Sequence, residues 1–236
     1  MDTLERARER DWYHTLELAP GQVVEGMFDM RPYVPHFGLP ERMDGLRALD
    51  VGTFDGFWAF EMERRGAEVV ALDVDSVAEL DYPARRRPAS FATEPRGGGF
   101  AIAKEALGSR VERVACSIYD ARPEDLGTFD VVLCGLVLIH LRDQVLALER
   151  IAGLCRDRFY SMEAYDPLLD LLPFPAARYK ADRDKDYVFW EPGSRGWRRL
   201  IWSAGFDSVE RVRRFRLPSE RGFAIRVVVH HARKSG

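Results

Sequence analysis

Short apolar runs alternate with amphipathic segments along most of the chain. Runs rich in Val, Leu and Ala, typical of buried parallel strands, lie at 47–51, 68–72, 111–116, 129–134 and 158–162. Segments with apolar residues on one helical face and charged residues on the other lie at 56–65, 100–108 and 144–154. Strands that alternate with helices in this way predict βαβ units and a parallel sheet.

The C-terminal part of the chain has a different pattern. A helix is predicted at 196–204 and ends at Gly205, and two strands follow at 209–217 and 222–230. The connection at 218–221 is too short for a crossover, so these two strands must pair antiparallel. The predicted fold is therefore α/β and Rossmann-like: a seven-stranded, mostly parallel sheet with an antiparallel C-terminal hairpin and helices on both faces.

Two segments lie outside this repeating pattern, within one expected domain over residues 1–236. Residues 1–44 precede the first strand of the predicted sheet and are expected to form a lid or cap over the site. Residues 166–190 are rich in Pro, Asp, Arg and aromatic residues and show no clear periodicity. Insertions of this kind often carry binding residues, so we expect this one to select the substrate.

Composition narrows the class of protein. Hydrophobic residues make up 46% and charged residues 31%, which excludes a disordered chain. No run approaches the roughly 20 apolar residues of a membrane helix, and residues 1–11 lack the apolar stretch of a signal peptide. Cys116, Cys134 and Cys155 are too widely spaced for a zinc site and are expected to be buried thiols in a reducing compartment. We expect a cytoplasmic protein with no membrane segment and no metal.

Charge is unevenly distributed along the chain. The net charge is −3, yet residues 195–236 hold eleven Lys and Arg against three Asp and Glu. A basic end could meet the phosphates of a nucleic acid. The favoured interpretation is that the same arginines form the solvent-exposed face of a helix and two strands. Because the chain as a whole is acidic, a small-molecule partner is favoured, and tRNA stays open as an alternative.

The sharpest local motif lies where the first predicted sheet strand ends, at 49–58 (LDVGTFDGFW). The G-x-G-x-x-G fingerprint of dinucleotide sites is absent, which disfavours a diphosphate cofactor. Asp50 and the Gly52 carbonyl could instead accept hydrogen bonds from the ammonium group of a sulfonium amino acid. Asp73 ends the next strand, 21 residues after Gly52, where a carboxylate can accept both ribose hydroxyls in this kind of fold.

These features predict that the loop binds S-adenosylmethionine as the cofactor. The alternative is that the loop is a glycine turn with surface aspartates and binds no cofactor. Ser117, Ile118 and Tyr119 follow the third strand and are placed to flank an adenine. The predicted cofactor contacts are Asp50, Gly52, Thr53, Asp55, Gly56, Trp58, Asp73, Val74, Ser117, Ile118, Tyr119, Cys134 and Leu136.

Several motifs together resemble the tRNA 5-methoxyuridine methyltransferase-like family. They are DVGTFDGFW at 50–58, GLVLIHLRD at 135–143, WYHT at 12–15, FDMRP at 28–32 and FWEPGSRGWRRLIWSAG at 189–205. The resemblance implies the class I methyltransferase fold and S-adenosylmethionine as cofactor. It also implies one of two acceptor classes, the wobble uridine of tRNA or a small hydroxylated molecule.

The chain departs from the family pattern at two positions. Phe54 replaces the middle glycine that is common in methyltransferase loops. Pro20, before Gly21, stands where the carboxymethyl-transferring relative is expected to have a lysine that holds an extra carboxylate. The second departure argues against a carboxylated donor.

Transfer of a methyl group to a hydroxyl requires the acceptor's proton to be removed. His140 follows the fourth strand at the carboxyl edge of the sheet and is the leading candidate for the general base, although it could equally pack and bond a backbone carbonyl. His230 and His231 end the last strand and are expected at the surface rather than as metal ligands. The predicted acceptor contacts are Tyr13, His14, Arg31, Glu163, Tyr165 and Trp190.

Three hypotheses follow. The first is O-methylation of a sugar or another small hydroxylated natural product, and the second is methylation of the tRNA wobble uridine. The third is a binding protein that retains the fold without catalysis. The sequence leaves the oligomeric state open between monomer and homodimer.

Overall fold

The computed structural model describes residues 2–87, 95–181 and 188–234. A seven-stranded sheet forms its centre, in the order β12-β13-β9-β8-β5-β6-β7. Strands β5 to β9 pair in parallel, and β13 pairs antiparallel with both β9 and β12. The strands are β5 (Arg47–Val51), β6 (Glu68–Asp73), β7 (Glu112–Ala115), β8 (Phe129–Gly135), β9 (Cys155–Ala164), β12 (Ser208–Pro218) and β13 (Ala224–Arg233). The predicted mostly parallel sheet with an antiparallel C-terminal hairpin is confirmed.

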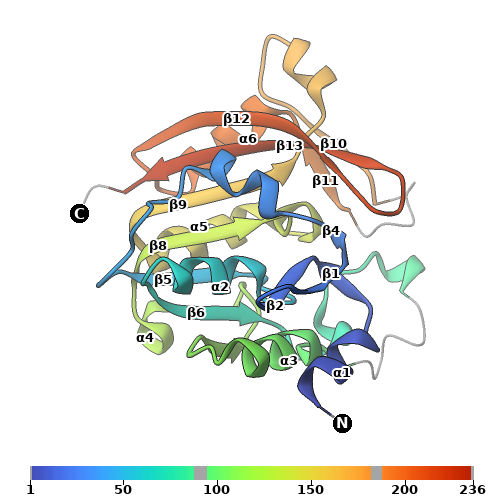
Figure 1. Cartoon of the computed structure of the whole chain (residues 1–236). Helices are drawn as coiled ribbons and strands as arrows, with labels where there is room; N and C mark the ends of the chain where they lie inside the picture. Colours follow the sequence, from blue (N-terminus) through green and yellow to red (C-terminus); the bar gives the residue numbers. More distant parts are fainter. Residues whose placement is uncertain (1, 88–94, 182–187, 235–236) are drawn as a thin grey trace.

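Helices cover both faces of this sheet. Figure 1 shows α2 on the near face and α5 and α6 behind the strands. The α-helices are α1 (Thr3–Arg8), α2 (Phe57–Arg64), α3 (Gly98–Leu107), α4 (Pro123–Leu126), α5 (Gln144–Leu154) and α6 (Ser194–Ser203). The short 3-10 helices are η1 (Arg31–Phe37), η2 (Val77–Glu79), η3 (Ala84–Arg86), η5 (Leu138–His140) and η6 (Pro167–Leu171). Within the described ranges, no helix has the length and apolarity needed to cross a membrane.

The N-terminal segment folds into two small ribbons that dock at one end of the sheet. Strand β1 (Trp12–His14) pairs in parallel with β4 (Gly26–Phe28), and β2 (Leu16–Ala19) pairs antiparallel with β3 (Gln22–Val24). Gly26 lies directly against the backbone of His14, where a Cβ atom would clash. The Trp12 indole donates a hydrogen bond to the Ala7 carbonyl at 2.8 Å and anchors α1 to the ribbons.

The segment after β9 contains more regular structure than the sequence indicates. Besides η6, it forms a hairpin of β10 (Ala177–Tyr179) and β11 (Trp190–Pro192), which pair antiparallel. The Phe189 amide donates to the Ile139 carbonyl at 2.9 Å, which attaches this hairpin to η5. The insertion is therefore fixed to the segment that carries His140.

The expectation that His230 lies at the surface is wrong, because it is only 1% exposed. It is enclosed because β13 is an internal strand between β9 and β12 rather than an edge. His231 is half-buried and lies against the Tyr160 ring with its Nε2 atom 2.5 Å from the Phe37 carbonyl. Cys134 and Cys155 are buried as expected, but Cys116 is partly exposed.

Candidate active site

A continuous cleft opens where β5, β6 and β8 end, at the carboxyl edge of the parallel strands. This is the edge at which α/β sheets bind their ligands. Two hollows make up the cleft and share part of their lining: Gly52, Asp73, Leu80, Asp81, Val137 and Leu141. The larger hollow holds about 940 Å³ of empty space including its open mouth.

The glycine loop closes the floor of this cleft through main-chain hydrogen bonds. The Gly52 and Thr53 amides donate to the Leu72 carbonyl at 2.8 and 3.2 Å. Gly52 has φ +73°, and a Cβ atom there would collide with the Val137 side chain. Because these amides are already paired within the protein, the loop does not offer the free N–H groups that a diphosphate requires.

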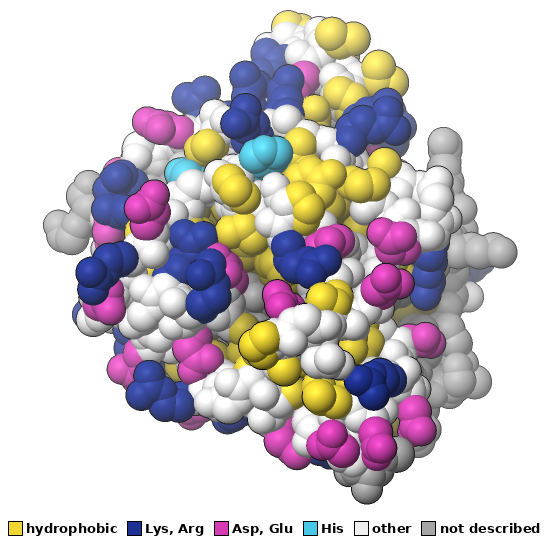
Figure 2. All heavy atoms as spheres, in the orientation of Figure 1, with side chains coloured by type: hydrophobic (Ala, Val, Ile, Leu, Met, Phe, Trp, Pro, Cys, Tyr) yellow, Lys and Arg dark blue, Asp and Glu magenta, His cyan; other side chains and the backbone are white. Residues whose placement is uncertain are grey.

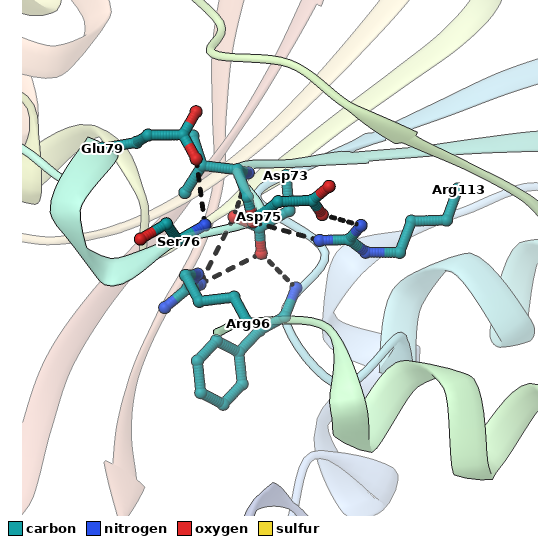
Figure 3. Close-up of polar contacts among 8 residues, drawn as sticks. Asp73, Asp75, Ser76, Glu79, Arg96 and Arg113 are labelled. Atoms are coloured by element: carbon teal, nitrogen blue, oxygen red, sulfur yellow. Dashed lines mark hydrogen bonds and ion pairs between the residues drawn. The ribbon is translucent and has the colours of Figure 1, made fainter. Parts of the chain in front are cut away.

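Asp73 presents its carboxylate to the cleft from the end of β6. It accepts hydrogen bonds from the Phe54 amide at 2.9 Å and the Val74 amide at 2.8 Å. Arg96 also pairs with this carboxylate, with its Nη2 atom 3.1 and 3.3 Å from the two oxygens (Figure 3). Arg113 instead binds Asp75 at 2.5 Å, beside this pair.

Two bulky residues of the cleft adopt left-handed backbone conformations. Phe54 has φ +50° and Leu136 has φ +57°, a region that large side chains rarely occupy. The Phe54 ring lies 5.1 Å from the Tyr13 ring and 4.7 Å from the Arg96 guanidinium carbon. The departure from glycine at Phe54 therefore supplies an aromatic wall to the cleft at the cost of local backbone strain.

The residues predicted to surround the adenine line one wall of the second hollow. Val74, Ser117, Ile118 and Tyr119 all line it. The Tyr119 hydroxyl donates to Asp81 at 2.6 Å and accepts from the Asp143 amide at 3.0 Å. Burial, followed by the bond to Asp81, raises the pKa of Tyr119, so this hydroxyl stays protonated.

Two histidines line the larger hollow. His140 ends η5 at one side, and His14 faces it from β1. Burial lowers the pKa of His14 to about 3, so its imidazole is neutral at physiological pH. The His14 ring lies 4.8 Å from the Tyr13 ring and 5.7 Å from the Phe57 ring. The hollow thus combines aromatic walls with two imidazoles.

Three of the predicted contact residues are carboxylates buried behind the cleft rather than in its lining. Asp55 accepts hydrogen bonds from the Tyr13 and His14 amides at 2.7 and 3.3 Å, and so holds β1. Glu163 is 1% exposed, and burial raises its pKa to about 8. Burial likewise raises the pKa of Asp50 to about 7.

Glu163 points away from the acceptor side for a specific reason. Its Oε1 atom accepts from the Val137 and Leu138 amides at 3.2 and 3.0 Å, which fixes the start of η5. Strand β9 also extends past the predicted run to Ala164, so Glu163 lies within the sheet instead of at its rim. It therefore supports the segment that carries His140.

The structure brings most, but not all, of the predicted residues to the cleft. Those that line it are Tyr13, His14, Gly52, Trp58, Asp73, Val74, Ser117, Ile118, Tyr119, Leu136 and His140. Those placed behind or beside it are Arg31, Asp50, Thr53, Asp55, Gly56, Cys134, Glu163, Tyr165 and Trp190.

The residues beside the cleft have identifiable partners. Arg31 pairs with Asp29 at 2.8 Å, and Tyr165 packs 5.2 Å beneath the Arg214 guanidinium. Cys134 is fully buried in β8. Trp190 lines a neighbouring groove.

Sequence reasoning missed several lining residues, chiefly Phe54, Asp81 and Arg96. Phe54 could have been found from its place inside the glycine loop. Arg96 follows an aperiodic stretch, and its pairing with Asp73 over 23 positions leaves no local signal.

Comparison with known proteins identifies the domain. Residues 49–158 match the family described as "Methyltransferase domain". A 50-residue stretch is 40% identical to the biotin biosynthesis bifunctional protein BioHC of Cellvibrio japonicus. The aligned stretch covers 21% of this chain and 10% of that protein. The chain thus spans about a tenth of the length of that relative.

Solved structures share the fold at low sequence identity. The N-terminal domain of EvdMO1 with S-adenosylhomocysteine bound has a TM-score of 0.65 at 18% identity, covering 99% of this chain and 97% of that one. The 1,6-didemethyltoxoflavin-N1-methyltransferase of Burkholderia thailandensis has a TM-score of 0.56 at 23% identity, covering 88% and 78%. Magnesium protoporphyrin IX methyltransferase of Synechocystis has a TM-score of 0.56 at 17% identity, covering 87% and 82%. Residues 49–158 therefore match a methyltransferase domain, and the S-adenosylhomocysteine bound in these neighbours supports S-adenosylmethionine as the cofactor.

Proposed function

We propose that this protein transfers the methyl group of S-adenosylmethionine to a hydroxyl group of a small molecule, such as a sugar or another natural product. The observation that carries this proposal is the cleft itself, which His140 lines together with Gly52 and Asp73 at the strand ends that would hold the cofactor. The toxoflavin-precursor and protoporphyrin methyltransferases compared above are named for small-molecule substrates, which supports a small-molecule acceptor.

The residues of the cleft fit the cofactor. Asp73 would accept the ribose hydroxyls, and Ile118 and Tyr119 would enclose the adenine. The Gly52 carbonyl would accept a hydrogen bond from the ammonium group. At position 52 a side chain would collide with Val137, so only glycine fits there. When bound, S-adenosylmethionine supplies an electrophilic methyl group on a sulfonium.

The protein's own contribution is to place the acceptor and remove its proton. In-line displacement needs the hydroxyl oxygen close to the methyl carbon, and holding it there lowers the barrier through orientation. His140 lines the cleft and would accept the hydroxyl proton as general base, a role that imidazole side chains commonly fill. His14, with a pKa of about 3, is too weak a base for that role and would orient the hydroxyl by a hydrogen bond.

The wobble uridine of tRNA is a second candidate acceptor, favoured by the family resemblance and by one surface. Figure 2 shows Lys and Arg side chains gathered at the top of the visible face, over β12. Exposed arginines on α6 and β12 are Arg195, Arg198, Arg199, Arg211, Arg213, Arg214 and Arg216. Part of this charge is already neutralised, since Arg214 pairs with Asp170. This surface could bind phosphates.

A direct transfer assay tests the choice of acceptor. Purified protein is incubated with methyl-labelled S-adenosylmethionine and either bulk tRNA or a panel of hydroxylated metabolites. The proposal expects label in a metabolite, on oxygen, as identified by mass spectrometry of the product. Label in tRNA would replace this acceptor class with the alternative, and label on nitrogen would contradict O-methylation.

A further inference from the structure

A second groove lies beside the cleft, between the loop that contains η3 and the β10–β11 hairpin. Its lining residues are Pro83, Ala84, Arg85, Arg142, Tyr179, Ala181, Phe189 and Trp190. Asp81 and Arg142 connect the cleft to this groove. Asp81 lines the cleft and accepts a hydrogen bond from the Arg142 amide at 2.8 Å, while the Arg142 side chain lines the groove. A molecule lying in the groove is therefore next to the cleft.

The hairpin presents two aromatic rings to this groove. Tyr179 and Trp190 are paired across β10 and β11, with ring centroids 4.9 Å apart in an edge-to-face arrangement. They are 49% and 38% exposed, which is high for rings of this size on a folded protein. Exposed aromatic side chains that already hold each other in place form a platform on which another ring can pack at little entropic cost.

The charge of the groove has one sign. Among its described lining residues, Arg85 and Arg142 are the charged ones. The Arg142 side chain is 63% exposed. It donates one hydrogen bond to the Tyr82 carbonyl at 3.4 Å, and the Asp81 carboxylate lies 3.8 Å away, too far for a hydrogen bond. Its guanidinium also lies 5.6 Å from the Phe189 ring. Guanidinium groups in this setting favour carboxylate and phosphate ligands, which they bind through paired N–H donors.

The groove is connected rigidly to the proposed base. The Gln144 side-chain amide donates to the Leu138 carbonyl at 2.9 Å and to the Trp190 carbonyl at 3.2 Å, and so joins the hairpin to η5. His140 is the last residue of η5. The aromatic platform and His140 are therefore held at a fixed separation.

We propose that this groove is a subsite for the acceptor, which takes an anionic group attached to a planar ring, while the hydroxyl to be methylated enters the cleft beside His140. The inference rests on the proposed function and narrows its substrate class from hydroxylated molecules to acidic, ring-containing ones. The shared chemistry is a ring with a carboxylate or a phosphate, carried either by a free aromatic acid or by a nucleotide.

Matched probes test this subsite. Calorimetry on protein saturated with S-adenosylhomocysteine compares 4-hydroxybenzoate with 4-hydroxybenzamide, and uridine 5′-monophosphate with uridine. At least one acidic probe is expected to bind roughly tenfold more tightly than its neutral partner, as a charged hydrogen bond to arginine would give. The pair that discriminates shows whether the ligand is an aromatic acid or a nucleotide.

Two substitutions locate the effect. Arg142→Met is expected to weaken the acidic probe roughly tenfold and to leave the neutral probe unchanged. The matched control is Arg199→Met, because Arg199 also lies over an aromatic ring, that of Trp202 at 4.3 Å, but on α6. The control should leave all probe affinities unchanged.

The inference is overturned if acidic and neutral probes bind alike, if none binds at millimolar concentration, or if the two variants behave the same. Its failure differs from failure of the proposed function. In the first case S-adenosylhomocysteine still binds and a neutral hydroxylated acceptor is still methylated. In the second, no small hydroxylated molecule is methylated at all.

Discussion

The two halves of the cleft are held in place by different kinds of contact. On the cofactor side, main-chain bonds from Gly52 and Thr53 to Leu72 fix the loop within the sheet. On the acceptor side, the carboxylate of Asp55 holds β1 and that of Glu163 holds η5. The glycine loop on the cofactor side therefore depends chiefly on backbone pairing, whereas β1 and η5 on the acceptor side also depend on single buried carboxylates whose charge can change with pH.

The largest expected effect separates the two halves by function. His140→Ala should lower kcat by about 10²–10⁴, the usual contribution of a general base, and leave the affinity for S-adenosylhomocysteine near that of the wild type. Steady-state kinetics and calorimetry measure the two quantities on the same preparation. His14→Ala is the comparison and should cost less turnover, because a neutral imidazole with a pKa of about 3 orients the hydroxyl without accepting its proton. Unchanged turnover in His140→Ala would remove it as the base.

The next largest effect is a loss of cofactor affinity. Asp73→Asn keeps the shape of the side chain but removes the charge that is expected to bind both ribose hydroxyls, so the affinity for S-adenosylhomocysteine should fall roughly 100-fold. Asp75→Asn is the control, since Asp75 pairs with Arg113 instead. Equal affinities in the two variants would place the ribose elsewhere.

The free energy of unfolding should depend on pH, because the cleft is supported by buried acids with raised pKa values. Burial raises the pKa of Glu163 to about 8 and that of Asp50 to about 7, so the folded state binds more protons than the unfolded state above the ordinary carboxyl pKa. Stability contributed by these groups is present at low pH and is lost as the pH rises through those values. His14 and His230 act oppositely, because burial lowers their pKa values to about 3 and about 4, and their contribution rises up to the ordinary histidine pKa.

The two effects oppose each other below pH 6.5 and leave a net fall in stability between about pH 6.5 and 8. Urea unfolding at pH 5.5, 6.5 and 8 measures this dependence. Glu163→Gln, which retains an oxygen for the Val137 and Leu138 amides, should flatten the fall above pH 6.5. A variant with the wild-type slope would show that Glu163 does not titrate there.

The smallest expected effect concerns Arg96. An ionised carboxylate offers about four acceptor positions, and the Phe54 and Val74 amides use two of those on Asp73. Two ribose hydroxyls would use the rest, so Arg96 has to withdraw when the cofactor binds. Arg96→Met should therefore bind S-adenosylhomocysteine about threefold more tightly, with Arg113→Met as the control. Weaker binding in Arg96→Met would mean that Arg96 contacts the cofactor instead.

The same contrast explains what could be predicted from the sequence. The strand 47–51, Gly52 and Asp73 follow from apolar periodicity and glycine spacing, because the cofactor side is built from neighbouring residues in regular elements. The burial of His230 could not be predicted, since a pair of antiparallel strands does not reveal which of them lies inside a sheet. The direction of Glu163 depends on how far β9 extends and on contacts with η5, neither of which has a local pattern.

The central claim is that the cleft between Gly52 and Asp73 binds S-adenosylmethionine, and titration calorimetry tests it most directly. Titration of the wild-type protein with S-adenosylmethionine and with S-adenosylhomocysteine is measured at two temperatures, because burial of apolar surface makes the heat depend on temperature and prevents it from vanishing at both. The account predicts one saturable site for each ligand, with binding weakened roughly 100-fold in Asp73→Asn. An absence of heat for both ligands at both temperatures would contradict it.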